Sequence, residues 1–495
     1  MVKNILKRFK NIELTFSALV YLLLFIFLLY PYRDYDWGWH YRLGEYFIKN
    51  GKIMLSDQYS WTMSGYVWSN HEWLYQPFHY VFFNTFSFLG MSIAGALLSL
   101  SWFYLGIKRY NLSYWQKAVL GFVFLNMIGG VVWQGLRVQM VGTLFIAVFV
   151  YLIPNIRIGD KKTLALLPLM FLLWANIHGY FIIGMCLFAI VLFSQIIIEF
   201  KDHGMRKSAR IFIPKSLLFG ILSFIVSFAA TLINPFTYHI YLEGLRHLDN
   251  PLLPYILEWV PFGWNSTLGL LILLYSLVIA GYFAKRRKLS DLPYILIFLF
   301  MLYYALVARR YVATYAVVTL PIAAMFVKSL PLHFEKYKAT VFLFLICALI
   351  GFEIGLFRRI PNSRLLNYTF QDYCSFGSNC SEGLVAYLKK NPPVGKGLNY
   401  YDWGGYLIGR GVPAKLFIDG RMHLWKDPKT GFQPFLAYQR MYYEGDYELF
   451  NEYDFDWLII STKSPLFEKI ASVKDLGMWA VKFADSETAY LVRVR

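Results

Sequence analysis

The sequence predicts a polytopic α-helical membrane protein with a small α/β domain at its C-terminal end. Two observations lead to this prediction. First, 58% of the 495 residues are hydrophobic and only 16% are charged, which is typical of many membrane spans and not of a soluble protein. Second, long apolar runs fill residues 1–357, whereas the apolar runs of residues 358–495 are short and strand-like. We therefore expect a transmembrane domain over 1–357 and an α/β domain over 358–495.

Long apolar runs predict about eleven transmembrane helices. The first run follows a basic N-terminus and has no small-residue cleavage site after it, so we expect an uncleaved span. The runs approach or exceed the roughly 20 residues that a helix needs to cross a bilayer. They lie at about 13–30, 82–106, 118–133, 138–153, 163–177, 179–199, 216–233, 265–284, 291–307, 311–328 and 339–357. Residues 176–179 separate two of these runs and are predicted to form a tight turn.

The distribution of Lys and Arg predicts the orientation. If the N-terminus is cytoplasmic, the inner segments hold 22 Lys and Arg residues and the short outer segments hold 8. Such an excess on the cytoplasmic side orients membrane proteins, so we expect residues 31–81 and 358–495 to be extracytoplasmic. The Lys and Arg residues that set the orientation also account for much of the net charge of +18. No basic patch is interleaved with aromatic residues, so nucleic acid is not predicted as a partner.

The tail is predicted to alternate strands and helices, as in a small α/β domain. Strands are expected at 396–401, 415–419, 456–462, 479–483 and 488–494, and helices at 381–390 and near 434–451. Cys374 and Cys380 flank a short loop in this tail. In an oxidising compartment they are expected to form a disulfide.

The first outer loop, residues 31–81, is the richest candidate for a functional site. Trp and Tyr gather at membrane interfaces, so an aromatic belt explains its many rings. A belt does not explain the carboxylates and histidines held among them, which are Asp34, Asp36, Glu45, Asp57, Glu72, His40, His71 and His79. Asp34 and Asp36 could share a divalent metal ion such as Mg²⁺ or Mn²⁺, or one could act as a general base with the other as its electrostatic partner.

Further polar residues fall at the ends of the predicted spans on the same, outer side. Ionisable groups at membrane depth are costly and usually functional, so this clustering predicts one cavity that opens outward. Besides the loop residues, the cluster contains Arg137, Gln139, Asn176, His178, Asn234, Glu258, Arg309 and Arg310. Simpler interpretations also exist. The arginines could bind lipid headgroups or extend to the interface, His71 and Glu72 could anchor the loop, and His178 could be a buried, hydrogen-bonded histidine.

The first loop carries a characteristic set of residues, which are Asp34, Asp36, Trp37, Trp39, His40, Gly44, Glu45, Asp57, Tyr59, Ser60, Trp61, Thr62, Trp68, His71, Glu72, Trp73 and Leu74. With these residues it resembles the first loop of bacterial members of the GT-C superfamily of membrane glycosyltransferases. The tail strings Trp403-Gly404-Gly405-Tyr406-Leu407 and Ile418-Asp419-Gly420-Arg421 are similar to strings in the same proteins. The W-W-D-Y-G string of oligosaccharyltransferases is absent from the sequence, which makes transfer of a large oligosaccharide to Asn less favoured.

The resemblance implies an inverting glycosyltransferase in the bacterial cytoplasmic membrane. Such an enzyme moves a sugar from a polyprenyl-phosphate or polyprenyl-diphosphate donor to a glycan, lipid or protein acceptor outside the cytoplasm. Asp36, or else Asp34, would deprotonate the acceptor hydroxyl. Arg137, Arg309 and Arg310 would stabilise the charge that builds on the leaving phosphate. His40, His71, Glu72, Asn176, His178 and Glu258 would contact substrate, and no cofactor besides the divalent metal is expected.

Two other functions remain open at this point. A transporter or flippase of a lipid-linked sugar should show repeated halves and polar residues near the middle of the bilayer, and the sequence shows neither. A non-catalytic protein that binds a lipid-linked glycan, or that scaffolds an envelope complex, would use the same residues as an enzyme. The sequence has no Walker-type loop and no G-x-G-x-x-G or G-x-S-x-G motif, so it does not predict ATP, nicotinamide or serine hydrolase chemistry.

Overall fold

The chain forms two compact units. The computed structural model describes residues 2–204, 214–247, 252–330, 365–472 and 478–494, together with Tyr337, residues 339–343, Leu345 and Cys347. Unit 1 comprises Met1–Tyr30, Ser92–Tyr238 and Pro254–Asn362, and unit 2 comprises Pro31–Met91, His239–Leu253 and Ser363–Arg495. Unit 2 therefore combines the first loop with the C-terminal part of the chain, although the two are far apart in sequence.

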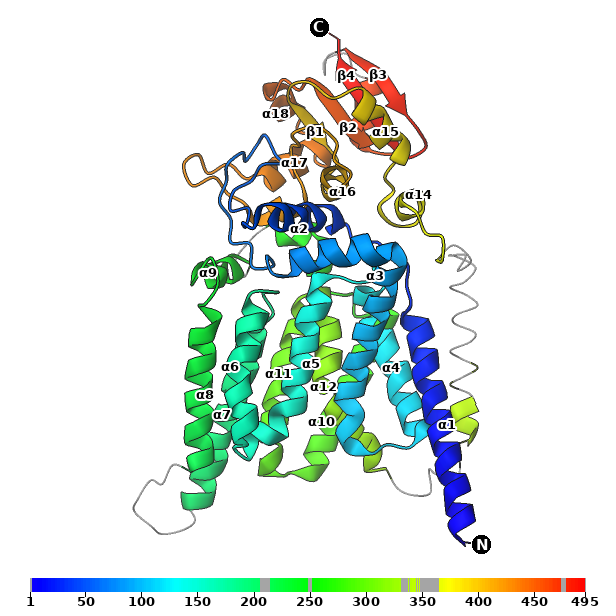
Figure 1. The fold of residues 1–495 in the computed structure, drawn as a ribbon, viewed down its shortest axis with the longest axis vertical. Helices are drawn as coiled ribbons and strands as arrows, with labels where there is room; N and C mark the ends of the chain where they lie inside the picture. Colours follow the sequence, from blue (N-terminus) through cyan, green and yellow to red (C-terminus); the bar gives the residue numbers. More distant parts are fainter. Residues whose placement is uncertain are drawn as a thin grey trace. The chain divides into compact units, whose positions relative to one another are not determined.

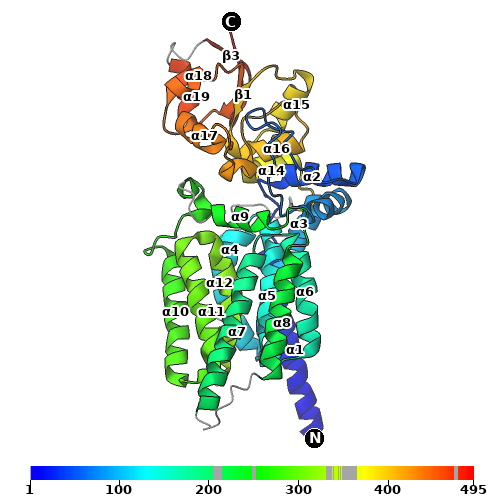
Figure 2. The same cartoon turned by 90° about the vertical axis from the view of Figure 1, so that its left-hand side faces the viewer.

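Unit 1 is a bundle of apolar helices (Figures 1 and 2). Helix α12 is the most enclosed, because 78% of the span Arg309–Lys328 is buried, compared with 28% of Asn11–Leu28 in α1. It packs on α4, α5, α10 and α11. The helices are α1 (Val2–Leu28), the second part of α3 (Tyr75–Ile107), α4 (Tyr114–Val132), α5 (Val138–Arg157), α6 (Lys161–Ala175), α7 (Phe181–Gly204), α8 (Lys215–Thr231), α10 (Thr267–Arg286), α11 (Leu292–Val307) and α12 (Val312–Lys328).

The predicted membrane fold is confirmed, but the number of spans is not. Among the described residues, eight helices are long and apolar enough to cross a membrane. The runs predicted at 163–177 and 216–233 form α6 and α8, which have 15 and 17 residues and so are shorter than a typical span. Helix α6 ends at Ala175 and α7 begins at Phe181, which confirms the predicted break between them. The run at 339–357 lies largely outside the described residues.

Unit 2 contains a four-stranded sheet of order β1-β2-β4-β3. Strand β1 (Gly397–Asn399) is parallel to β2 (Trp457–Ser461), and β4 (Thr488–Arg493) is antiparallel to β2 and to β3 (Trp479–Ala484). The helices of this unit are α2 (Trp37–Asn50), the first part of α3, α9 (His239–Arg246), α14 (Phe370–Tyr373), α15 (Glu382–Lys390), α16 (Gly404–Gly409), α17 (Pro434–Tyr442), α18 (Tyr447–Glu452) and α19 (Pro465–Ser472).

Two expectations for the tail are wrong in detail. Residues 415–419 do not form a strand of the sheet, because Leu416 pairs with the first loop through a single bridge to Ser60. The Leu416 N–H donates to Tyr59 O at 2.9 Å, and its carbonyl accepts from the Trp61 N–H at 3.0 Å. The helix expected near 434–451 is two helices, α17 and α18. They are separated at Gly445, whose φ of 73° is left-handed and interrupts a helix.

Glycines bring α2 and α16 into close contact. A Cβ atom at Gly38 would lie 1.8 Å from Gly405 O, and one at Gly409 would lie 2.4 Å from Gly38 Cα. No larger residue fits at such an approach without moving backbone. The Trp403-Gly404-Gly405 string is thus explained by packing, because its second glycine holds the start of α2 against the tail.

Cys374 and Cys380 form the predicted disulfide. The loop that it closes lies against the segment that precedes α2. The Tyr373 hydroxyl, next to the bridge, donates to Asp34 O at 2.6 Å, and the Tyr35 hydroxyl donates to Gly377 O at 3.2 Å. The disulfide loop therefore supports the Asp34-Tyr35-Asp36 segment of the first loop.

Candidate functional site

Asp34 is buried and holds the turn that starts α2. Asp34 is only 1% exposed, and its Oδ1 accepts the Asp36 N–H at 3.2 Å. The Tyr32 hydroxyl lies 3.5 Å from Oδ2. A short polar side chain that bonds the backbone two residues ahead is a common way to fix a turn. In this arrangement the carboxylate of Asp34 orients Asp36.

Asp36 directly precedes α2 and is half-buried. The Trp39 indole N–H donates to Asp36 Oδ1 at 2.9 Å, which fixes the direction of the carboxylate. Gly420 lies against the same oxygen, since a Cβ atom there would be 2.3 Å from Oδ1. Two strings that were noted separately in the sequence, in the first loop and in the tail, therefore meet at the Asp36 carboxylate.

Asp402 is a second carboxyl group at this place, and sequence reasoning missed it. Burial raises the pKa of Asp402 to about 6, the negative charge of Asp36 adds to the rise, and a hydrogen bond from Tyr400 opposes it. Asp402 immediately precedes the Trp403-Gly404-Gly405 string, whose packing on α2 brings it near Asp36. Only that string could have drawn attention to it, since an isolated acid in a tail has no distinctive pattern.

We expect Asp402 to make stability depend on pH. Its pKa is about 6 in the folded protein against an ordinary 3.8, so the folded state binds more protons between these values. The free energy of unfolding should therefore fall as pH rises from about 4 to about 6, and then level off. Chemical denaturation of the purified protein in detergent across this range should show the slope, and Asp402→Asn should flatten it. An unchanged slope in the variant would contradict the assignment.

His40, His71 and Glu72 gather beside α2. Glu72 lies between the two imidazoles, with Oε2 3.8 Å from His40 Nε2 and Oε1 3.7 Å from His71 Nε2. His40 is 1% exposed and its ring lies 3.6 Å from the ring of Trp39, which bonds Asp36. The structure thus brings these three predicted substrate-binding residues together, and connects them to Asp36 through Trp39.

The first loop does not supply a ready metal site. Among the residues that the structure describes, no group of three or more His, Cys, Asp or Glu side chains is arranged to hold a metal ion. Asp34, one of the two predicted metal ligands, is buried and bonds the backbone of Asp36. These two residues do not fit a shared Mg²⁺ or Mn²⁺.

The predicted phosphate-binding arginines lie in unit 1. Glu258 bridges two of them, with Oε2 3.3 Å from Arg137 Nη1 and Oε1 3.1 Å from Arg310 Nη1. The Arg310 guanidinium also stacks 4.2 Å from the Trp259 ring, and its buried Nε–H has no hydrogen-bond partner within the described part of the chain. Arg309 lies next to this group and donates to Pro261 O at 3.4 Å. The cluster has more positive than negative charges and holds an unsatisfied donor, which suits an anion.

Asn176 and His178 occupy the turn between α6 and α7 of the same unit. Both are buried. The Asn176 amide donates to Leu172 O and Ile233 O, and His178 Nδ1 accepts the Tyr180 N–H at 3.2 Å. The Tyr180 ring in turn lies 6.1 Å from the ring of Tyr311, which follows Arg310. These two residues therefore support the turn, and His178 is linked to the arginine cluster through Tyr180.

The predicted site residues thus fall into two groups. Unit 2 holds Asp34, Asp36, His40, His71 and Glu72, and unit 1 holds Arg137, Asn176, His178, Glu258, Arg309 and Arg310. Each group is brought together by its own contacts. The unit 2 residues all belong to the first loop, whereas the unit 1 residues come from segments that are distant in sequence.

A buried ion triad connects the first loop with the tail inside unit 2. Arg421 Nη2 lies 2.7 Å from Asp57 Oδ1 and 2.7 Å from Asp419 Oδ2. Each of the three residues is at most 7% exposed. The rings of Tyr59, Trp68 and Trp425 surround the guanidinium at 5.2–5.4 Å. The triad fixes the backbone on both sides of Gly420, the residue that contacts Asp36.

Comparison with solved structures identifies the fold. No protein-family model matches the chain, and no curated protein does. An oligosaccharyltransferase of Archaeoglobus fulgidus tethered to an acceptor peptide matches with a TM-score of 0.57 at 12% identity, over 98% of this chain and 74% of that one. The oligosaccharyltransferase AglB of the same organism, in complex with an inhibitory peptide and a dolichol-phosphate, matches with a TM-score of 0.56 at 11% identity, over 92% and 70%.

A further protein matches along nearly its whole length. ArnT from Cupriavidus metallidurans bound to undecaprenyl phosphate has a TM-score of 0.51 at 12% identity, over 97% of this chain and 98% of that one. Its apo form has a TM-score of 0.53 at 14% identity, over 98% of each chain. These identities are too low to transfer an activity, but the coverage is nearly complete. The chain therefore shares the fold of AglB and ArnT.

Proposed function

We propose that this protein transfers a sugar from a polyprenyl-phosphate or polyprenyl-diphosphate donor to an extracytoplasmic hydroxyl acceptor. The observation that carries the proposal is Asp36, a half-buried carboxylate oriented by Trp39 and by the Asp34 turn, in a chain with the GT-C fold. A positioned carboxylate at an accessible place is what a general base requires. A scaffold protein would not need the direction of the Asp36 carboxylate to be fixed from two sides.

Asp36 acts on the acceptor in the proposed reaction. It takes the proton of the acceptor hydroxyl as that oxygen attacks the anomeric carbon of the donor sugar. The bond between the anomeric carbon and the phosphate oxygen breaks, and the lipid phosphate leaves with the electron pair. This single displacement inverts the configuration of the sugar. His40, His71 and Glu72 are proposed to bind sugar hydroxyls, because together they offer both donors and acceptors of hydrogen bonds.

The arginine cluster of unit 1 is proposed to bind the donor phosphate. Negative charge grows on this phosphate as it leaves, so fixed cations stabilise the transition state more than the ground state. Arg310 is the strongest candidate, since its buried Nε–H has no hydrogen-bond partner among the described residues and its guanidinium is held by Trp259. Glu258 keeps Arg137 and Arg310 apart and oriented, and the two arginines would exchange their bonds to Glu258 for bonds to the phosphate.

Replacing Arg310 by Gln should weaken both donor binding and turnover. The loss of a charge-assisted bond to phosphate costs about 1.5–3 kcal/mol, or roughly 10- to 150-fold in donor affinity. Binding of a fluorescent polyprenyl phosphate to purified protein measures the first effect, and sugar transfer measures the second. Arg287→Gln is the control, because Arg287 is an exposed arginine at the end of α10. Equal affinities of the two variants would refute the phosphate site.

We also propose the orientation that the charge distribution predicts, with a cytoplasmic N-terminus and an extracytoplasmic tail. The excess of 22 over 8 Lys and Arg residues on one side supports it. A reporter that is active only outside the cytoplasm, fused after residue 494, should be active. Activity of a cytoplasm-specific reporter at the same position would reverse the orientation.

A further inference from the structure

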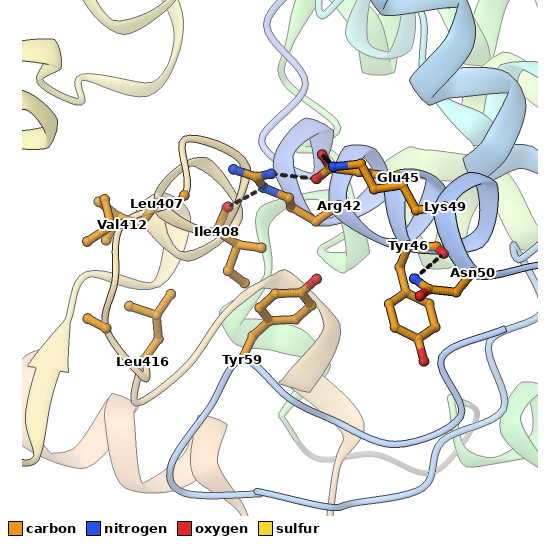
Figure 3. A pocket seen from close by; sticks show the side chains of 12 residues that line it. Arg42, Glu45, Tyr46, Lys49, Asn50, Tyr59, Leu407, Ile408, Val412 and Leu416 are labelled. Carbon is orange, nitrogen blue, oxygen red and sulfur yellow. Dashed lines mark hydrogen bonds and ion pairs between the residues drawn. The ribbon is translucent and has the colours of Figure 1, made fainter. Parts of the chain in front are cut away.

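Unit 2 contains a pocket that is not lined by Asp34, Asp36, His40, His71 or Glu72. Its volume is about 360 Å³. One wall is formed by α2, which contributes Arg42, Glu45 and Lys49 (Figure 3). The other wall is apolar and comes from α16 and the segment that follows it, including Leu407, Val412 and Leu416. The space is therefore polar on one side and apolar on the other.

Ion pairs connect the side chains of the polar wall. Glu45 bonds Arg42 Nη1 at 2.5 Å and Lys49 Nζ at 2.7 Å, so one carboxylate serves two cations. Arg42 Nε donates to Ile408 O at 3.1 Å, which fixes the guanidinium across the pocket. The third nitrogen, Nη2, makes no hydrogen bond within the described part of the chain and lies beside Gly411, where a Cβ atom would be only 2.4 Å away. The pocket thus presents an oriented N–H donor.

The surroundings carry a surplus of positive charge. Arg42 and Lys49 together exceed Glu45 by one unit of charge. Burial lowers the pKa of Lys389, and the positive charges of Arg410 and Arg42 lower it further, with Glu382 opposing them. A ligand with one negative charge would therefore be attracted to this wall.

Two phenol rings complete the pocket. Tyr46 and Tyr59 line it, and burial raises the pKa of Tyr59 to about 12, so its hydroxyl stays protonated and can both donate and accept. The side-chain amide of Asn50 donates to Tyr46 O at 2.8 Å, which directs the amide oxygen of Asn50 away from Tyr46 O. Aromatic rings, mixed donors and acceptors and an apolar floor fit the alternating polar and C–H faces of a sugar ring.

We propose that this pocket binds an acidic saccharide, in which a sugar carboxylate bonds Arg42 Nη2 and Lys49. The place of the pocket on α2 fits an acceptor chain. At a rise of 1.5 Å per residue, Arg42 lies about 9 Å and Asn50 about 21 Å along the helix from Asp36. Trp39, Arg42 and Tyr46 are spaced to share one face of the helix, so the face that orients Asp36 continues into the pocket. In calling the saccharide an acceptor, this inference rests on the proposed transfer function.

The test measures binding without any donor, so that it does not depend on transfer. The probes are methyl β-D-glucuronoside and methyl β-D-glucoside, which differ only in the carboxylate. Titration of the full-length protein in detergent should give a Kd on the order of 1 mM for the acid and about tenfold weaker binding for the neutral sugar. Added salt should reduce this preference.

Two variants and one control locate the binding. Lys49→Gln should weaken the glucuronoside about threefold, and Glu45→Gln should strengthen it, because the competing carboxylate is gone. Lys463→Gln is the matched control, since Lys463 is an exposed lysine paired with Glu487 just as Lys49 is paired with Glu45. Equal binding of the two probes, no binding of the acid, or an equal effect of Lys49→Gln and Lys463→Gln would each overturn the proposal. If Asp36→Asn abolishes sugar transfer but the variant still binds the glucuronoside, the assignment of this pocket as a saccharide site is unaffected.

Discussion

Replacing Asp36 by Asn is expected to lower the rate of sugar transfer by about 10²–10⁴-fold, the usual contribution of a positioned general base. The amide keeps the size of the side chain and can still accept the Trp39 N–H bond, so the fold around α2 should remain. It cannot take a proton from the acceptor hydroxyl. Because the donor phosphate is assigned to other residues, donor affinity should change little.

Asp427→Asn provides the control for this variant. Asp427 is a carboxylate of the same unit that is half-buried, as Asp36 is, and its Oδ1 accepts the Lys429 N–H. The control should transfer sugar at the parent rate. If Asp36→Asn also does so, Asp36 is not the base, and Asp402 becomes the next carboxyl group to replace.

Replacing Arg421 by Met is expected to destabilise the protein by about 3–5 kcal/mol. The guanidinium is the only partner that neutralises the buried carboxylates of Asp57 and Asp419 among the ion pairs of the described residues. Removing one member of a buried ionic group leaves uncompensated charge, which costs far more than the group gains while intact. Chemical denaturation in detergent, followed by tryptophan fluorescence, measures the change.

A second replacement separates the charge effect from lost packing. In the Arg421→Met background, Asp57→Asn removes one of the stranded charges and should restore part of the stability, whereas in the parent it should be destabilising. This change of sign is the mark of a coupled pair. A cost for Arg421→Met of less than about 1 kcal/mol would place the triad among ion pairs of little consequence.

The membrane fold was predictable because apolar run length alone decides it. The number of spans was not, since a run such as 163–177 is apolar throughout, but helix α6, which is capped by Asp160 and Asn176, has only 15 residues. The expected strand at 415–419 failed for a related reason. Its strand-like residues are satisfied by one bridge to Ser60 of the first loop, and sequence periodicity does not reveal which segment a strand will pair with.

The sequence indicated only part of the candidate site, because the rest depends on tertiary contacts. Asp34, Asp36, His40, His71 and Glu72 stand within one loop, so their density in the sequence marks them. Asp402 and Gly420 reach Asp36 only through the packing of α16 on α2 and through the Arg421 triad. Contacts of this kind depend on the tertiary fold, and they leave only the short Trp403-Gly404-Gly405 and Asp419-Gly420-Arg421 strings as traces in the sequence.

The central claim is that the chain is a glycosyltransferase whose base is Asp36. The most direct measurement incubates purified protein with a polyprenyl-phosphate sugar labelled in the sugar and with glycan, lipid and peptide acceptors, and follows the label. The account predicts that the parent protein moves label from the lipid to one of these acceptors with inversion at the anomeric carbon, and that Asp36→Asn does so at least about 10²-fold more slowly. Binding of the lipid donor by both proteins, with no transfer to any acceptor by the parent, would contradict it.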